Sequence, residues 1–129
     1  MKQGFVKVAS ATPRIRVADP VYNAQVICEQ AKEAAEHGAK IVVFPELCIT
    51  GYTCNDLFLQ ELLLEKAKEA LLTIAEETGQ LETLFLVGLP VDKDGRLYNV
   101  AAVLYRGRIL GMIPKKNIPM YAEFYEGRH

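Results

Sequence analysis

Residues 40–52, KIVVFPELCITGY, place an acidic side chain directly after a short apolar run. The segment Lys40–Phe44 is mostly β-branched or aromatic, which predicts a buried β-strand. Pro45 and Glu46 follow it, and the chain then becomes apolar again. A carboxylate in such surroundings costs free energy unless a partner compensates it. Glu46 therefore needs either a structural or a functional reason to be there.

The preceding residues complete a strand–helix–strand unit. Residues 5–10 alternate apolar and polar side chains and predict a first strand, and the proline-interrupted residues 11–20 predict a loop. Asp19 and Pro20 form a helix start, and Gly38 ends that helix. Its apolar face is spaced as a helix requires: Ala24, Ile27, Cys28, Ala31, Ala34 and Ala35. Such a unit implies that the two flanking strands run parallel.

The rest of the chain predicts one more helix and three more strands. The helix covers residues 57–77; its inward face is Leu59, Leu63, Ala67, Ala70 and Ile74, and its solvated charges are Glu65, Lys66, Lys68 and Glu69. Strands follow over residues 84–90, 97–105 and 109–113, the first two joined by an Asp94–Gly95 hairpin turn and the last two by the turn RGR. Residues 114–129 predict a loop with a functional role. The expected fold class is α/β.

Composition excludes several kinds of protein. The chain has 129 residues, a formal net charge of −1 and 50% hydrophobic residues, as in an ordinary soluble domain. We expect no dedicated nucleic-acid or membrane binder, and the N-terminus lacks a signal-peptide core, so we expect a cytoplasmic protein. Three cysteines (Cys28, Cys48 and Cys54) and two isolated histidines predict neither a disulfide framework nor a metal site. Both common phosphate-binding glycine motifs are absent from the sequence.

Two groups could carry chemistry. Glu46 lies just beyond the carboxyl end of a parallel strand, where α/β proteins place their sites, and partial burial would suit it to proton transfer. A Glu that only bonds backbone amides or a surface Arg is the alternative. The pair Lys115–Lys116 follows the strand 109–113 and would meet Glu46 if the two strands end at the same sheet edge.

These residues lie in motifs of a known family. The elements FPELCITGY (residues 44–52) and PKKNIPMYAEFYEGR (residues 114–128) resemble the nitrilase, or carbon–nitrogen hydrolase, superfamily. The second element is more similar to the N-terminal glutaminase domain of glutamine-dependent NAD⁺ synthetases. The resemblance implies part of an α-β-β-α sandwich, a mixed sheet with helices on one face.

The resemblance also implies roles for individual residues. In a Glu–Lys–Cys triad, Glu46 would be the general base and Lys115 the partner of the oxyanion, with Lys116 as a solvated neighbour or the reverse. Tyr52 and Tyr121 would line the glutamine pocket, and Glu123 would orient the lysine and substrate. The nucleophilic cysteine of the family follows the lysine element, and neither Cys48 nor Cys54 stands in that place.

The resemblance therefore implies that residues 1–129 are the N-terminal part of a glutaminase domain and inactive alone. The whole protein would hydrolyse L-glutamine and pass ammonia to a synthetase domain that converts deamido-NAD⁺ with ATP and Mg²⁺. No cofactor is expected in these residues. Uncovered apolar surface would favour a homo-oligomer. The alternatives are another amidase of the superfamily and a non-catalytic interaction module.

Overall fold

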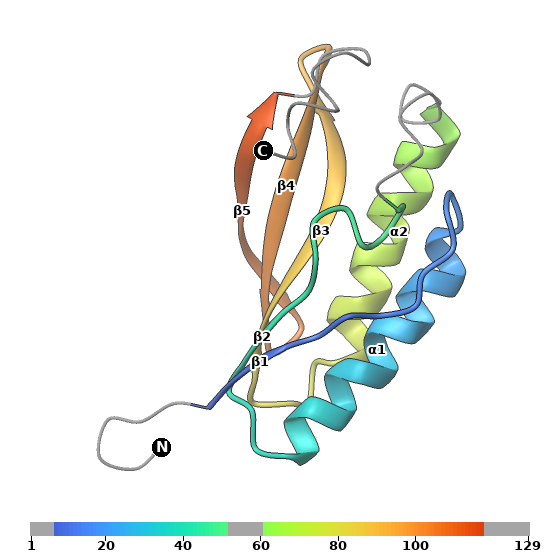
Figure 1. The fold of residues 1–129 in the computed structure, drawn as a ribbon. Helices are drawn as coiled ribbons and strands as arrows, with labels where there is room; N and C mark the ends of the chain where they lie inside the picture. The colour runs from blue at the N-terminus through green and yellow to red at the C-terminus, as the bar shows by residue number, and fades with distance from the viewer. Residues whose placement is uncertain (1–6, 52–60, 118–129) are drawn as a thin grey trace.

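The computed structural model describes residues 7–51 and 61–117, which form one mixed sheet with two helices on one of its faces (Figure 1). The elements, in chain order, are β1 (Val8–Ser10), α1 (Pro20–Glu36), β2 (Ile41–Val43), α2 (Glu61–Glu77), β3 (Leu84–Lys93), β4 (Arg96–Tyr105) and β5 (Arg108–Asn117). The strand order follows the sequence, β1-β2-β3-β4-β5. This confirms the predicted α/β class and the helices on one face.

The first three strands run parallel, and one hairpin joins β3 to β4 and another joins β4 to β5. β1 pairs with β2 and β2 with β3 in parallel, while β3–β4 and β4–β5 are antiparallel. Asp94 and Gly95 both have positive φ, as do Arg106 and Gly107, so each hairpin closes through a two-residue turn of the type that matches strand twist. Two antiparallel steps make β5 parallel to β3, so β2, β3 and β5 end at the same edge of the sheet.

The core lies between the sheet and the two helices. Alternate side chains of the central strands point towards the helices, among them Val42, Phe85, Val87 and Leu89, each at most 1% exposed. α1 contributes Ala24, Ile27, Cys28 and Ala31, and α2 contributes Leu63, Ala67, Ala70, Leu71 and Ile74. The predicted inward faces are confirmed except at the end of α1, where Ala34 is half-buried against the core and Ala35 is half-buried outside it. Leu59 lies outside the described residues.

Helix α1 begins and ends as its sequence predicts. The Asp19 side chain accepts a hydrogen bond from the Tyr22 backbone N–H at 3.1 Å, and Pro20 occupies the first helical position, where its missing N–H costs nothing. At the other end Gly38 has a φ of +89°, the left-handed conformation that glycine adopts most readily.

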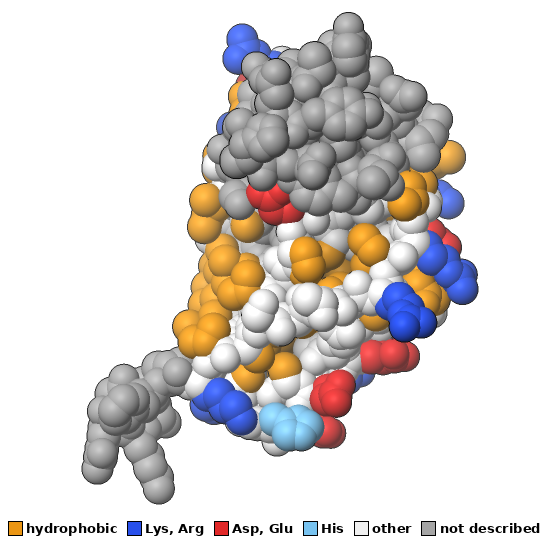
Figure 2. Space-filling model, viewed as in Figure 1, with side chains coloured by type: hydrophobic (Ala, Val, Ile, Leu, Met, Phe, Trp, Pro, Cys, Tyr) orange, Lys and Arg blue, Asp and Glu red, His pale blue; other side chains and the backbone are white. Residues whose placement is uncertain are grey.

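The opposite face of the sheet is apolar and partly open. Val43, Leu86 and Val103 share one row across β2, β3 and β4, and Ile113 on β5 faces the same way. Val43 is 39% exposed and Ile113 is 54% exposed. Figure 2 shows hydrophobic side chains gathered along the side of the molecule where β5 lies in Figure 1.

The last strand corrects the sequence prediction. We expected β5 to stop at residue 113 and a loop to begin at Pro114, but the strand continues to Asn117. Proline interrupts a sheet by removing a backbone donor. Among the described strands β5 lies at the edge and pairs with β4 alone, so that loss is tolerated there. β3 similarly passes through Pro90, beyond the pairing with β2 that ends at Leu86.

Candidate functional site

Glu46 lies in the turn that directly follows β2, at the carboxyl edge of the parallel strands. Its side chain is half-buried, whereas Leu47, Cys48 and Ile49 after it are at most 1% exposed. The prediction that an acid stands beyond a parallel strand among buried residues is therefore confirmed. Its role as a general base is a prediction that rests on the family resemblance.

The backbone around Glu46 is pressed against β3 at Gly88. A Cβ atom added to Gly88 would lie 2.5 Å from the Leu47 nitrogen and 2.8 Å from the Pro45 oxygen. Real Cβ atoms do not approach backbone this closely, so only glycine permits the contact. The sequence signal for such a contact is a glycine inside an apolar strand, and Gly88 is not among the predicted site residues.

Hydrogen bonds hold the turn on both sides of Glu46. Before it, the Phe44 N–H donates to the Leu86 oxygen at 2.9 Å; after it, the Ile49 N–H donates to the Gly88 oxygen at 3.2 Å. Between them Leu47 has a φ of +53°, a left-handed conformation that costs a non-glycine residue roughly 1–2 kcal/mol. Strained residues of this kind cluster at functional sites, where the surrounding structure enforces them.

Cys48 lies two residues after Glu46 in the same turn and has the environment of a packing residue. Its thiol is 1% exposed and lies 3.7 Å from the Gly88 oxygen, which it can reach as a weak donor. Burial raises the pKa of the Cys48 thiol to about 12. Because the thiolate is the reactive species, this environment is the opposite of one that activates a nucleophile.

Lys115 and Lys116 lie within β5, not after it as the sequence predicted. The register passes from Val100 opposite Pro114 to Asn99 opposite Lys116, so Lys115 is the extra residue of a β-bulge. Through β4, these positions are level with Leu89 and Pro90 of β3, one or two residues beyond Gly88.

The structure thus brings the backbones of Glu46 and Lys115 to one edge of the sheet, although β2 and β5 are not neighbours. Glu46 sits over β3 and Lys115 lies two strands away, or about 10 Å at the usual strand spacing. The Lys115 side chain lies outside the described residues, as do Tyr52, Cys54, Tyr121 and Glu123.

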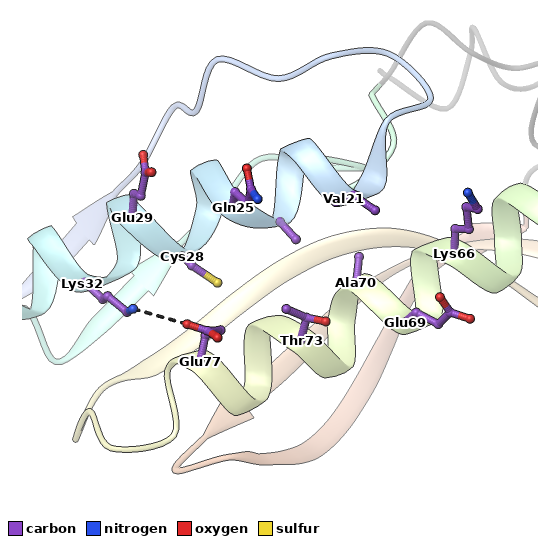
Figure 3. A pocket seen from close by; sticks show the side chains of 11 residues that line it. Val21, Gln25, Cys28, Glu29, Lys32, Lys66, Glu69, Ala70, Thr73 and Glu77 are labelled. Carbon is purple, nitrogen blue, oxygen red and sulfur yellow. Dashed lines mark hydrogen bonds and ion pairs between the residues drawn. The ribbon is translucent and has the colours of Figure 1, made fainter.

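A concave region between α1 and α2 contains none of the predicted site residues. This groove, of about 610 Å³, is lined by Val21, Ala24, Gln25, Cys28, Glu29, Lys32, Lys66, Glu69, Ala70, Thr73 and Glu77 (Figure 3). Lys32 and Glu77 form an ion pair across it at 3.5 Å. Its mixture of acidic and basic side chains, with Lys32 and Glu77 paired, is typical of a solvated helix surface.

Within the described residues, no group of three or more His, Cys, Asp or Glu side chains could hold a metal ion. Among the same residues, no helix is long and apolar enough to cross a membrane.

Known proteins resemble the chain over almost its whole length. The family model described as carbon-nitrogen hydrolase matches residues 7–126. The glutamine-dependent NAD(+) synthetase of Mycobacterium tuberculosis is 40% identical over 127 residues, which cover 98% of this chain and 19% of that protein. The chain therefore spans about a fifth of the length of that curated relative.

Solved structures agree with the fold. The glutamine-dependent NAD(+) synthetase from Cytophaga hutchinsonii superposes with a TM-score of 0.80 at 31% identity, over 86% of this chain and 19% of that one. An amidase from Nesterenkonia sp. superposes with a TM-score of 0.75 at 22% identity, over 98% of this chain and 48% of that one, which shows a shared fold. The chain belongs to the carbon–nitrogen hydrolase family.

Proposed function

We propose that this chain is the N-terminal part of the glutaminase domain of a glutamine-dependent NAD⁺ synthetase. The observation that carries the proposal is the position of Glu46 at the carboxyl edge of the sheet, in a turn held against Gly88, within a chain 40% identical to such a synthetase. The 22% identity to an amidase of the same fold gives no comparable support to a free amidase.

The chemistry would be hydrolysis of the L-glutamine side-chain amide. Glu46 takes the proton from a cysteine thiol supplied by residues beyond these, and the thiolate attacks the amide carbon. Glu46 then gives that proton to the departing ammonia, leaving a thioester. A water molecule that loses its proton to Glu46 cleaves the thioester, releasing glutamate and restoring the thiol.

Lys115 would stabilise the negative oxygen of both tetrahedral intermediates. The separation of about 10 Å between the two backbones is within the combined reach of an extended lysine and glutamate side chain meeting around a small substrate. Tyr52, Tyr121 and Glu123 would complete the pocket, as the family pattern implies. The ammonia would then serve an ATP- and Mg²⁺-dependent amidation of deamido-NAD⁺ carried out outside these residues.

The test is Glu46→Gln in the complete polypeptide, which removes the proton acceptor and keeps the shape. We expect glutamine-dependent NAD⁺ formation to be abolished and ammonia-dependent formation to be largely unchanged, since free ammonia bypasses the amidase step. Equal loss of both activities would make Glu46 structural. A wild-type protein without glutamine-dependent activity would overturn the proposed function.

A further inference from the structure

Asn23, in the first turns of α1, has a buried side chain that the proposed chemistry does not use. It is 0% exposed and lies on the inward face of the helix, one turn before Ile27. Asparagine is a poor helix former and a costly residue to bury, so this position requires hydrogen-bond partners. The structure provides three of them.

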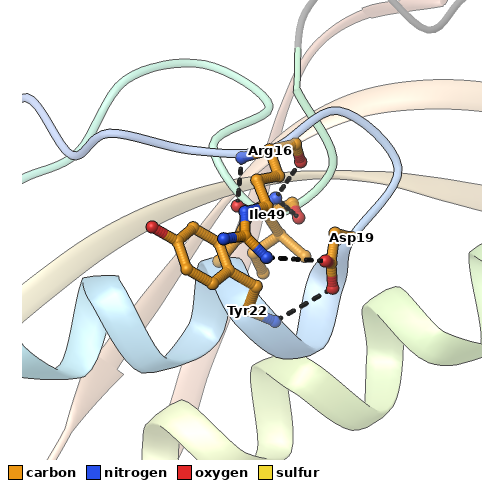
Figure 4. A network of polar contacts seen from close by, with 5 residues as sticks. Arg16, Asp19, Tyr22 and Ile49 are labelled. Carbon is orange, nitrogen blue, oxygen red and sulfur yellow. Dashed lines mark hydrogen bonds and ion pairs between the residues drawn. The ribbon is translucent and has the colours of Figure 1, made fainter.

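The Asn23 amide joins two loops that are far apart in the sequence. Its Oδ1 accepts from the Arg16 N–H, and its Nδ2 donates to the Arg16 oxygen and to the Ile49 oxygen, each at 2.7 Å. Figure 4 shows Arg16 and Ile49 meeting above the start of α1. One side chain thereby fixes the loop before α1 to the turn that carries Glu46.

Ile49 is consequently held through both of its backbone polar groups. Its N–H donates to the Gly88 oxygen of β3, and its C=O accepts from Asn23. The Gly51 N–H in turn donates to the Leu47 oxygen at 2.7 Å, which closes the left-handed turn immediately after Glu46. The far end of the Glu46 turn is therefore fixed to α1 as well as to the sheet.

The Arg16 side of this junction is also fixed. The Arg16 guanidinium lies 3.8 Å from the centre of the Tyr22 ring and 3.9 Å from an Asp19 carboxylate oxygen, both at the start of α1 (Figure 4). Next to it, the Ala18 N–H donates to the Thr50 oxygen at 2.7 Å. The start of α1 and the Glu46 turn thus form one hydrogen-bonded unit.

We infer that Asn23 is a positioning residue for Glu46, acting through the Ile49 carbonyl; the inference rests on the proposed function of Glu46. Only a primary amide offers an acceptor to one backbone N–H and donors to two backbone oxygens at this spot. Loss of the donors would leave the Ile49 oxygen unpaired and release the end of the turn. Small displacements of a catalytic group lower turnover steeply, by as much as about 100-fold for 1 Å.

The test compares Asn23→Asp with Gln25→Glu in the complete polypeptide. Both replace an amide by a carboxylate on α1, but Gln25 is exposed and serves as the matched control. We expect Asn23→Asp to lower kcat for glutamine hydrolysis by roughly 10- to 100-fold, with KM within about twofold and ammonia-dependent NAD⁺ formation retained. Gln25→Glu should change none of these. A normal kcat in Asn23→Asp, or equal loss of both activities, would overturn the inference.

A second readout does not depend on the substrate. The Ile49 N–H donates to Gly88 of β3 and the Gly51 N–H to Leu47 of the turn. Hydrogen exchange of both amides should become at least about tenfold faster in Asn23→Asp and stay unchanged in Gln25→Glu. Unchanged exchange would overturn the inference even if the proposed function failed for other reasons. If Asn23→Asp does not fold, Asn23→Ser, which avoids a buried charge, replaces it in both measurements.

Discussion

The turn that carries Glu46 and the strand that carries Lys115 are held in very different ways. Leu47, Cys48 and Ile49 are at most 1% exposed and are bonded to β3 and to α1. Within the part of the chain that the structure describes, β5 pairs with one strand, and four apolar side chains between Ile109 and Ile113 are 36–56% exposed. The described residues therefore determine the position of the acid much more fully than that of the lysine.

The largest expected effect concerns the Cys48 thiol in the Glu46 turn. With a pKa of about 12 instead of the ordinary 9.0, the Cys48 thiolate fraction at pH 8 falls from about one in ten to about one in 10,000. Alkylation of Cys48 by iodoacetamide, followed by mass spectrometry, should therefore be at least about 1,000-fold slower in the native protein than in urea, because burial also blocks access of the reagent. Burial raises the pKa of Cys28 to about 11, so its alkylation should be at least about 100-fold slower in the native protein than in urea. Rapid native labelling of Cys48 would show that the turn opens readily.

The same shift predicts a loss of stability in alkali. Because the pKa of Cys48 is raised on folding, the unfolded chain releases this proton first as the pH rises. The contribution is complete below pH 9 and disappears as the pH approaches about 12. In Cys48→Ala, the decrease in melting temperature between pH 9 and 11 should be shallower than in the unsubstituted protein. An identical slope would contradict the burial of the thiol.

The next prediction compares two glycines. Gly88 in β3 contacts the Glu46 turn, and Gly111 lies in β5, the strand that carries Lys115. Gly88→Ala forces a Cβ into the backbone of the Glu46 turn and should lower the free energy of unfolding by about 3 kcal/mol, the upper range for overpacking. Gly111→Ala in β5 meets nothing within 4 Å and should stay within about 0.5 kcal/mol. Thermal or urea denaturation of the two variants gives the comparison. Equal effects would mean that the turn adapts as easily as the edge strand.

The sequence predicts the framework well because its signals are local. The Asp19–Pro20 helix start, the Asp94–Gly95 turn and the apolar spacing of both helices are each specified within a few residues, and each is confirmed. The predicted end of β5 at residue 113 is wrong, because the strand continues through Pro114 to Asn117. Whether proline breaks a strand depends on whether the strand has neighbours on both sides. The sequence of residues 109–114 does not show how many strands pair with β5.

The candidate site was only partly predictable for a related reason. Glu46 follows a strand, so its place could be derived from the sequence alone. Gly88 and Asn23 support it from 42 residues downstream and 23 residues upstream. Their importance appears only when the fold brings the three segments together, although an asparagine on an apolar helix face and a glycine in an apolar strand were both visible signals.

A smaller effect is expected on the open face of the sheet. Ile113 is 54% exposed, so Ile113→Ala in the 129-residue chain removes about half of the usual burial and should cost about 1 kcal/mol. The same substitution in a longer polypeptide measures whether other residues cover this face. A cost of several kcal/mol there would show that β5 gains a second packing partner, and the contrast with the Glu46 turn would then shrink.

The smallest effect is expected at the ion pair across the helix groove. The Lys32 and Glu77 side chains are 45% and 54% exposed, and exposed pairs of this kind contribute only about 0.2–1 kcal/mol, less at high salt. Lys32→Ala should therefore lower the melting temperature slightly in low salt and not at all in 1 M NaCl. In the complete polypeptide it should leave the proposed glutamine hydrolysis unchanged. A clear loss of that activity would place substrate chemistry in the groove between α1 and α2, because neither Glu46 nor Gly88 contributes to its lining.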